Sequence, residues 1–284
     1  MVLTIDVGNS NIKFVFFENG MIARTHRVET VRSFTKDDFL NKLPFYFEEA
    51  GIAVSDIEGG IISSVVPSVS HALLPAVEYV TGKHFFMLGR DVETDLVFEM
   101  DNPSTIGQDL IADTVGALSI CDPPVIIFDT GTATTMNVVD QRGVYIGGLI
   151  IPGLQISLDA LCSRAAQLPP IEVKDPRSFI AKNTVDSMRS GLIYGHAAMI
   201  DDLIRRTERE LGVPCTAVAT GGLMALIIDH CDHRIMYRPN LVCDGLYLLY
   251  QRSKARFIEN IYPAENDSRM TSESDTDSKV WKHD

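Results

Sequence analysis

One sequence pattern occurs twice in this chain, and its repetition constrains the fold more than any single motif. An apolar run ends in Asp6-Val7-Gly8 and a small polar turn, and 123 residues later a second run ends in Asp129-Thr130-Gly131. Each copy continues as another apolar stretch and closes at a glycine 14 residues after its aspartate, Gly20 or Gly143. A single Asp-x-Gly between apolar runs is a common hairpin turn, but two matched copies favour a duplicated domain. The sequence predicts two β-hairpins that face each other.

The repeated turn has the chemistry of a phosphate site. A carboxylate at the end of a buried strand can hold a metal, and the glycine after it lets backbone N–H groups approach an anion. The chain contains no Gly-x-x-x-x-Gly-Lys-[Ser/Thr] loop, and Asp6-Val7-Gly8 leads into a strand rather than a helix. These two facts exclude a P-loop and a dinucleotide-binding fingerprint. We therefore expect a nucleotide cleft between the two halves, built from strand–turn–strand units.

Composition and charge restrict the partners of the chain. Its 284 residues are enough for two domains with separate cores, and 45% hydrophobic with 22% charged residues is ordinary for a globular protein. The formal net charge of −13 argues against a nucleic-acid partner, which needs clustered Lys and Arg. The same charge repels ATP over much of the surface, so an ATP site must be made locally positive by Mg²⁺ and backbone amides.

Nothing in the sequence predicts a membrane or secretory location. No apolar run reaches the roughly 18 residues that a membrane span needs, and Met1 leads into the first predicted core strand without a signal-peptide pattern. We therefore expect a cytoplasmic protein that contacts no membrane. The five cysteines are scattered and suit reduced thiols, and the compact run His230-Cys231-Asp232-His233 lacks the ligand spacing of a zinc site.

Apolar strands alternate with amphipathic segments, which predicts an α/β fold whose sheets are covered on both faces. We place two domains at residues 1–120 and 121–255, and we expect a disordered tail at 264–284, where Ser, Thr, Asp and Glu dominate. After its hairpin, the first domain should contain a strand, a helix, a strand, a helix and a strand at residues 21–28, 35–50, 57–66, 73–81 and 84–88.

The second half contains a long helical segment at 184–207, which we expect to be interrupted at Gly191 and Gly195. A strand at 216–220 delivers the pair Gly221-Gly222. That pair suits either a close backbone approach to adenosine or a turn that begins a helix, and the residues alone do not separate these two interpretations.

A candidate catalytic carboxylate lies between the two halves. Pro103 and Gly107 mark a loop, and the apolar spacing after it predicts a helix that begins near Gly107 with Asp109 in its first turn. An aspartate there is favourable to the helix dipole and needs no further role. A loop-to-helix junction beside a phosphate site is also where a kinase would place a carboxylate that orients an acceptor hydroxyl. Asp113, one helical turn later, is the competing candidate.

These residues resemble the type III pantothenate kinases, a family of the acetate and sugar kinase/Hsp70/actin superfamily. The resemblance extends over about residues 1–255 and rests on several separated motifs. The segment from Asp6 to Lys13 is similar to the family's D-x-G-N-[ST]-x motif, Gly107-Gln108-Asp109-Leu110 to its G-x-D-R motif, and the segment from Asp129 to Thr134 to its D-x-G-T-A-x motif. Two further signatures match residues 147–153 and the Asn183-Thr184 pair followed by residues 187–191.

The resemblance implies two actin-like (ribonuclease H-like) domains and ATP-dependent phosphorylation of pantothenate, the first step toward coenzyme A. It implies that ATP is bound by Asp6, Val7, Gly8, Asn9, Ser10, Asn11, Ile12, Lys13 and Thr132. It implies that pantothenate is bound by Met100, Gly107, Gln108, Asp109, Leu110 and Thr184. Asp109 would be the catalytic proton acceptor, Asp129 a ligand of K⁺ or NH₄⁺, and Asp6 the partner of Mg²⁺ on ATP. The family's acceptor site lies at a dimer interface, so the resemblance also implies a homodimer.

Two departures from the family pattern fall on the acceptor side. The family usually has Arg where this chain has Leu110, and commonly Tyr where it has Met100. Leucine cannot replace the bidentate grip of a guanidinium on a carboxylate or phosphate. Two alternatives therefore remain: a kinase of the same fold for another small hydroxylated acceptor, or a non-catalytic nucleotide-binding regulator such as the relatives called Bvg accessory factors. The presence of Asp6, Asp109 and Asp129 counts against the second alternative.

Overall fold

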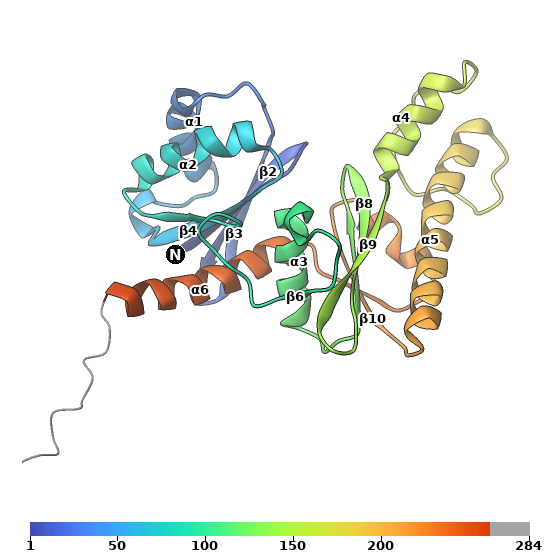
Figure 1. Ribbon diagram of the computed structural model, residues 1–284. Helices are drawn as coiled ribbons and strands as arrows, with labels where there is room; N and C mark the ends of the chain where they lie inside the picture. The colour runs from blue at the N-terminus through green and yellow to red at the C-terminus, as the bar shows by residue number, and fades with distance from the viewer. Residues whose placement is uncertain (262–284) are drawn as a thin grey trace, which may run out of the picture.

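Two β-sheets lie side by side, each with its own helices, in the computed structural model, which describes residues 1–261 (Figure 1). The first sheet has the order β3-β2-β1-β4-β5, with β1 (Val2–Val7), β2 (Asn11–Glu18), β3 (Met21–Glu29), β4 (Gly59–Ser64) and β5 (Phe85–Met87). The second has the order β11-β10-β7-β8-β9-β6, with β6 (Val97–Phe98), β7 (Val125–Thr130), β8 (Ala133–Val139), β9 (Val144–Pro152), β10 (Thr216–Thr220) and β11 (Ile235–Tyr237). The predicted α/β class and the duplication are confirmed.

The two sheets repeat one arrangement. In each, an antiparallel hairpin (β1–β2 or β7–β8) is extended on one side by a third antiparallel strand and on the other by a parallel strand, β4 or β10. The six α-helices of the described residues are α1 (Lys36–Glu49), α2 (Pro67–Thr81), α3 (Gln108–Leu118), α4 (Leu154–Arg164), α5 (Thr184–Leu211) and α6 (Leu241–Ile261). Short 3₁₀ turns occur at Val54–Asp56, Pro103–Thr105, Met224–Leu226 and Ile228–His230.

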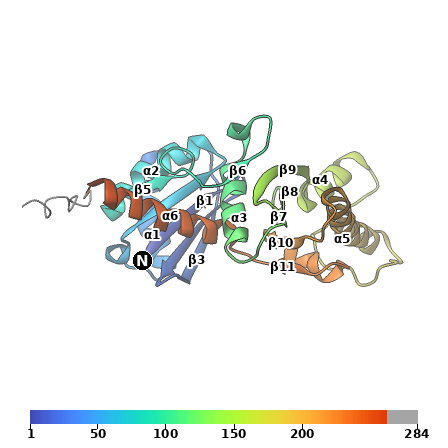
Figure 2. The ribbon, with the colours of Figure 1, turned by 60° about the horizontal axis from the view of Figure 1, so that its bottom comes forward.

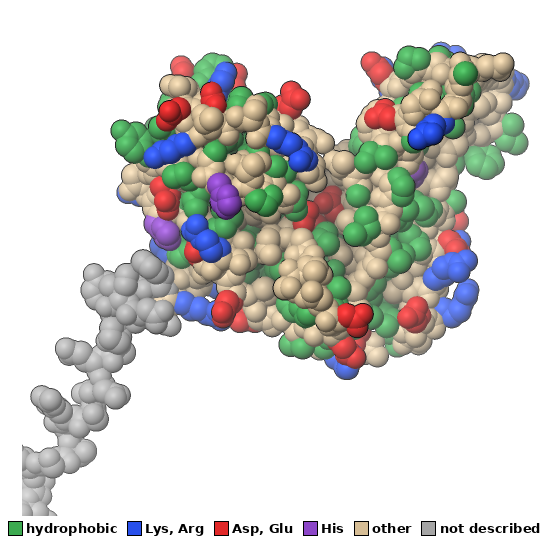
Figure 3. Space-filling view, turned by 45° about the horizontal axis from the view of Figure 1, so that its top comes forward, with side chains coloured by type: hydrophobic (Ala, Val, Ile, Leu, Met, Phe, Trp, Pro, Cys, Tyr) green, Lys and Arg blue, Asp and Glu red, His purple; other side chains and the backbone are tan. Residues whose placement is uncertain are grey.

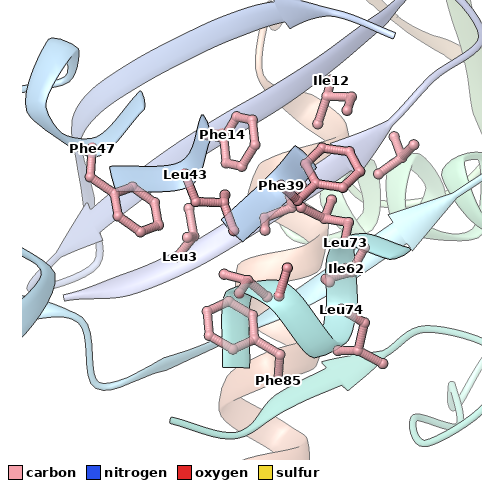
Figure 4. Packing of buried hydrophobic residues seen from close by; sticks show 14 of the residues in the cluster. Leu3, Ile12, Phe14, Phe39, Leu43, Phe47, Ile62, Leu73, Leu74 and Phe85 are labelled. Atoms are coloured by element: carbon pink, nitrogen blue, oxygen red, sulfur yellow. The ribbon is translucent and has the colours of Figure 1, made fainter. Parts of the chain in front are cut away.

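Alternation along β1 and β2 decides which face of the first sheet each side chain joins. Leu3, Ile5, Phe14 and Phe16 are fully buried on the face that α1 and α2 cover, where they meet residues such as Phe39 (Figure 4). The intervening residues of both strands face α3 and α6 instead, where they form a second apolar cluster. Both faces are therefore covered, as the sequence pattern predicts.

Helix boundaries in the first half follow local chemistry. A reciprocal capping box between Thr35 and Asp38 begins α1, which matches the predicted helix at 35–50. The predicted helix at 73–81 is too short, because α2 begins at Pro67. Strand β4 ends at Ser64, and Pro67 starts the helix, since proline at the first helical position has no N–H to lose and its φ is already suitable.

Helix α5 is continuous over 28 residues, so the predicted interruption at Gly191 and Gly195 is wrong. A methyl group built on either glycine would meet nothing within 4 Å, and both therefore lie on an open face of the helix. Buried residues on the opposite face, among them Ile193, Ile200 and Ile204, pack onto the second sheet. This packing overrides the weak helix propensity of two exposed glycines.

Helices α3 and α6 cross between the two sheets (Figure 2). Their backbones touch at two glycines: a Cβ at Gly245 would lie 1.9 Å from the Ala112 carbonyl oxygen, and one at Gly116 would lie 2.6 Å from the Leu241 carbonyl oxygen. From this crossing α6 continues along β1 and β4 of the first sheet. The chain thus returns to the first half at the end of the described residues.

Two elements cross the boundary that we place near residue 120. Strand β6 precedes it but pairs with β9 in the second sheet, and α6 follows it but packs on the first sheet. The division into residues 1–120 and 121–255 stays a proposal, and the predicted tail at 264–284 lies outside the described residues. No helix within residues 1–261 is both long and apolar enough to cross a membrane.

Candidate functional site

The two predicted phosphate turns meet. The Ser10 hydroxyl oxygen of the first turn lies 3.0 Å from the Thr132 hydroxyl oxygen of the second, across 122 residues of sequence. Each turn is closed by its glycine amide, which donates to the Asn11 carbonyl at 3.0 Å in the first turn and to the Ala133 carbonyl at 2.9 Å in the second. The prediction that the two hairpins face each other is confirmed.

A segment after β3 holds the first turn in place. The Thr30 amide donates to the Ser10 carbonyl at 3.0 Å, and the Thr30 hydroxyl donates to the Gly8 carbonyl at 2.8 Å. The Arg32 guanidinium donates to the Asn9 side-chain oxygen at 2.8 Å. Our sequence reasoning did not find Thr30 and Arg32, because neither belongs to a repeated motif and the contact exists only when β3 pairs with β2.

Glycines pack around the second turn because backbone atoms occupy the space of a side chain. A Cβ on Gly153 would lie 2.5 Å from the Gly131 and Thr132 carbonyl oxygens, and one on Gly221 would lie 2.4 Å from the Thr130 carbonyl oxygen. Gly221 also has φ +91°, which only glycine adopts easily. No α-helix begins after Gly221-Gly222, since a short 3₁₀ turn follows at Met224–Leu226.

Four aspartates share the space between the halves, and their electric fields act on one another. Burial, together with the negative charges of Asp109 and Asp129, raises the pKa of Asp6 to about 7. Burial and Asp109 likewise raise the pKa of Asp129 to about 6. Lys13 opposes both shifts. Acidic side chains are visible in the hollow between the two lobes (Figure 3).

Asp109 and Asp113 differ in their access to a ligand. Asp113 is 0% exposed, and neither of its carboxylate oxygens has a hydrogen-bond partner among the described residues. Asp109 is only partly buried, and its carboxylate accepts a hydrogen bond from the Leu110 amide at 2.9 Å. A Cβ on Gly107 would lie 2.4 Å from the Asp109 carboxylate, so the glycine leaves room for that side chain. Burial raises the pKa of both aspartates.

A row of polar side chains crosses the first sheet on the face toward the second half. Asp6 is directly opposite Ser63 on β4 and Lys13 on β2, and Lys13 is in turn opposite Arg27 on β3. Directly opposed residues of neighbouring strands point to the same side of a sheet. The Lys13 ammonium donates to the Pro239 carbonyl at 2.7 Å, and it thereby links β2 to the segment after β11.

The predicted acceptor residues are in two places. Met100 and Leu110 are half-buried against the apolar cluster under the first sheet, and the Gln108 side chain lies over Gly89. Thr184, at the start of α5, lines a pocket of about 500 Å³ between α4 and α5 together with Leu158 and His196. None of the other predicted site residues lines this pocket. Within one chain, the structure does not bring Thr184 and Asp109 together in a pocket.

The site fits a cation that arrives with a ligand better than one held by protein alone. Within residues 1–261, no three His, Cys, Asp or Glu side chains converge closely enough to hold a metal. Carboxylates that repel each other and lack partners, as Asp113 does, favour positive charge nearby. Mg²⁺ commonly binds through one or two carboxylates plus substrate phosphates, which matches this donor set.

Two duplicated α/β halves with facing phosphate turns and a carboxylate cluster between them define a two-domain protein of the actin-like class. Solved structures agree on the fold: a Baf family transcriptional activator from Campylobacter jejuni has a TM-score of 0.57 at 18% identity, with 89% of this chain and 99% of that chain covered. A reductive activator for a corrinoid, iron–sulfur protein has a TM-score of 0.51 at 12% identity, with coverages of 91% and 62%.

Sequence comparison identifies the family. The type III pantothenate kinase model matches residues 2–206. A type III pantothenate kinase from Bacillus cytotoxicus is 37% identical over 257 residues, which cover 89% of this chain and 97% of that protein. One from Exiguobacterium sibiricum is 39% identical over 254 residues, with coverages of 89% and 100%. The chain belongs to the type III pantothenate kinase family.

Proposed function

We infer that this protein transfers the γ-phosphoryl group of ATP to the primary hydroxyl of pantothenate, which begins coenzyme A synthesis. Family membership supports the reaction. The observation that carries it is the juxtaposition of the two phosphate turns, with Ser10 and Thr132 3.0 Å apart beside a cluster of carboxylates. The predicted location of the reaction is the cytoplasm.

ATP would lie along the first turn, with its phosphates between the two hairpins. Asn9, Ser10 and Asn11 are exposed there, as is Thr132 on the opposite turn. Gly8 closes the turn, and Lys13 supplies positive charge beside Asp6. Gly221-Gly222 offers an exposed backbone edge beside the end of β7 for the adenosine moiety.

Asp109 would accept the hydroxyl proton of pantothenate as the hydroxyl oxygen bonds to the γ-phosphorus, while the bond from that phosphorus to the bridging oxygen breaks and ADP leaves. Its raised pKa makes the carboxylate a better proton acceptor than an ordinary aspartate. Asp113 is fully buried and has no surface with which to touch an acceptor. We therefore assign the catalytic role to Asp109 and not to Asp113.

Two cations complete the proposed site. Asp129 would hold K⁺ or NH₄⁺, and Asp6 would face Mg²⁺ bound to the ATP phosphates. The mutual repulsion of Asp6, Asp109 and Asp129 supports positive charge at both positions. When bound, Mg²⁺ neutralises phosphate charge in the transition state.

A homodimer would complete the acceptor site. The second half exposes large apolar side chains on β9, α4 and the loop before α5, namely Leu149, Ile150, Ile156, Leu161, Phe179 and Ile180. Ile150 and Ile180 are each 79% exposed, which is unusual for isoleucine outside an interface. Thr184 lies beside this surface and lines a pocket without Asp109. We propose that the Thr184 side of one subunit faces the Asp109 side of the other.

The presence of Leu110 among the predicted acceptor-binding residues favours one alternative function. In this alternative, the protein is a kinase of this fold for another small hydroxylated acceptor. Leu110 and Met100 present apolar surface where the family pattern has a cation and an aromatic hydroxyl. An acceptor without a carboxylate at that point would suit these residues better than pantothenate.

A coupled assay of ATP turnover separates the two functions. Pantothenate is compared with a panel of hydroxy acids and sugars, in K⁺, NH₄⁺ or Na⁺ buffers with Mg²⁺. We expect turnover with pantothenate, dependent on Mg²⁺ and stimulated by K⁺ or NH₄⁺. Turnover with another acceptor alone would establish the alternative, and equal rates in all three buffers would remove the role of Asp129.

A further inference from the structure

Arg27 occupies the outer end of the polar row on the first sheet. It lies directly opposite Lys13, which is directly opposite Asp6, so the three side chains project from the same face. This face is turned toward the second half of the molecule, where Lys13 reaches the Pro239 carbonyl. Arg24, three residues earlier on β3, projects from the other face and donates to the carbonyl of its neighbour Ala23.

The Arg27 guanidinium reaches across to the second half. Its Nη1 atom would be 3.6 Å from a Cβ built on Gly222, the exposed glycine that follows β10. Its charge acts on two groups on opposite sides of the cleft, since it counters the raised pKa of Asp6 on β1 and of Tyr237 on β11. Arg27 therefore stands between the phosphate turn of the first half and the glycine pair of the second.

The guanidinium is available for a ligand. Arg27 is exposed, and in residues 1–261 it has neither a hydrogen bond nor an ion pair, whereas Arg32 donates to Asn9 and Arg142 pairs with Asp140 and Glu99. A guanidinium has five N–H donors in a planar fork that matches phosphate oxygens. The chain has a net charge of −13, so a cation with unused hydrogen-bond donors at the proposed nucleotide cleft would attract the phosphates of ATP.

We propose that Arg27 is a nucleotide-binding residue, which contacts the phosphate chain of ATP from β3 with the guanidinium that lies beside Gly222. The inference rests on the proposed function, because it requires ATP in the cleft. It adds an arginine from outside the repeated motifs to the phosphate site. It also predicts that bound ATP joins the first sheet to the second through this side chain.

A purely electrostatic role is the competing explanation. Arg27 could act only through Asp6, by offsetting the carboxylate charge, without touching ATP. The two roles differ when Asp6 is replaced by asparagine. If Arg27 contacts ATP, replacing it still weakens ATP binding in the Asp6→Asn background. If Arg27 acts only through the Asp6 charge, replacing it has no effect on ATP binding in that background.

Calorimetric titration with Mg²⁺ and ATP, ADP or adenosine tests the proposal. Arg27→Gln is compared with the parent and with Arg24→Gln, the matched control on the other face of the same strand, and thermal melts check that all remain folded. We expect Arg27→Gln to weaken ATP binding about 10- to 100-fold, adenosine binding by less than twofold, and Arg27→Lys to give an intermediate loss. Arg24→Gln should bind ATP like the parent.

Each result has one meaning. An equal loss of ATP affinity on Arg27→Gln in the parent and in Asp6→Asn supports direct contact. Three results overturn the proposal while the proposed kinase stands. The first is that Arg27→Gln leaves ATP affinity unchanged in the parent. The second is that it lowers ATP affinity in the parent but not in Asp6→Asn. The third is that it lowers adenosine affinity as much as ATP affinity. A parent that binds no ATP overturns both.

Discussion

At the scale of single residues, space around the Asp109 carboxylate is set by its neighbours. The missing side chain of Gly107 leaves room for it, and the Leu110 amide holds one of its oxygens. The same helix buries Asp113 completely one turn later. Asp109 and Asp113 thus have similar sequence contexts and differ in their exposure. Mutation can test which of them is the proton acceptor.

Replacing Asp109 by asparagine should preserve the shape of the site but remove its proton acceptor. We expect turnover to fall about 10²- to 10⁴-fold with ATP affinity retained, measured by the coupled assay and by calorimetry. Asp113→Asn is the matched change one helical turn away, and it should lower turnover less than tenfold. The reverse ranking would give the catalytic role to Asp113.

Leu110 tests the identity of the acceptor. If the carboxylate of pantothenate lies near this half-buried position, Leu110→Arg should lower KM for pantothenate by about tenfold or more, because a charge-assisted contact contributes about 1.5 to 3 kcal/mol. Leu110→Met keeps an apolar side chain and should leave KM nearly unchanged. A KM that stays the same or rises in Leu110→Arg would mean that the carboxylate is bound elsewhere or is absent from the acceptor.

Asp201 is a structural carboxylate outside the site. It accepts hydrogen bonds from the Asp232 amide at 2.7 Å, the His233 amide at 2.9 Å and the His233 ring at 2.8 Å. Burial by itself would raise the pKa of Asp201, but these donors hold it below the ordinary value of 3.8. Two residues of the run His230-Cys231-Asp232-His233, Asp232 and His233, thus donate hydrogen bonds to Asp201.

Removing this carboxylate should cost stability in a pH-dependent way. Because the folded pKa lies below the unfolded one, the contribution is complete above about pH 4 and is lost as pH falls through the lower folded value. We expect Asp201→Asn to lower the free energy of unfolding by about 2 kcal/mol at pH 7, and by less below pH 4. Asp202→Asn, at a half-buried neighbour whose carboxylate pairs with Arg205 and Arg206 on the helix surface, should lower the free energy of unfolding much less than Asp201→Asn in the same denaturant titrations. A pH-independent loss would contradict the assignment.

At the scale of elements, the α3–α6 crossing joins the two halves. Its closest approach depends on Gly116 and Gly245, which let backbone meet backbone. Helix α3 carries Asp109 at its first turn and meets α6 at Ala112 and Gly116. The position of Asp109, the proposed proton acceptor, relative to Asp6 and Asp129 therefore depends on how closely α6 approaches α3.

Gly245→Ala should disturb this crossing. The new methyl group would lie 1.9 Å from the Ala112 carbonyl oxygen, which belongs to helix backbone and cannot rotate away. We expect a loss of about 3 kcal/mol in the free energy of unfolding, measured with denaturant. Gly195→Ala, on the open face of α5, should instead stabilise by up to about 1 kcal/mol. A neutral Gly245→Ala would show that the helices can separate without cost.

At the scale of the whole molecule, the proposed acceptor site spans two subunits. One chain places Thr184 in a pocket without Asp109, beside an exposed apolar surface. The chain mass is 31.4 kDa, so sedimentation should give about twice that value. The dimer also makes a sharper prediction about activity.

Two inactive variants should restore each other if the site forms between subunits. In a heterodimer of Asp109→Asn and Thr184→Ala, one of the two sites receives both changes and the other receives neither. Random mixing makes about half of the dimers heterodimers, so we expect about a quarter of parental turnover after unfolding and refolding together. Each variant refolded alone is the control. No recovery would place Thr184 and Asp109 in the same subunit's site or outside the site.

Local sequence determined the parts of this protein that depend on neighbouring residues. The repeated Asp-x-Gly turns, the α/β class, the Thr35 cap and the first-turn position of Asp109 follow from short-range stereochemistry and hydrogen bonding. The predicted interruption of α5 at Gly191 and Gly195 is wrong because it considers only the weak helix propensity of these glycines, which is a local property. The packing that stabilises α5 involves distant residues.

Only the tertiary structure decided what depends on distant contacts. The approach of Ser10 to Thr132, the support of the first turn by Thr30 and Arg32, and the position of Arg27 over Gly222 require strands and halves to meet. The surroundings of the buried Asp113 also depend on both halves, because the charges of Asp6 in the first half and Asp129 in the second both act on it. The physical reason is that short-range patterns specify elements, whereas exposure, charge coupling and cleft geometry arise between elements.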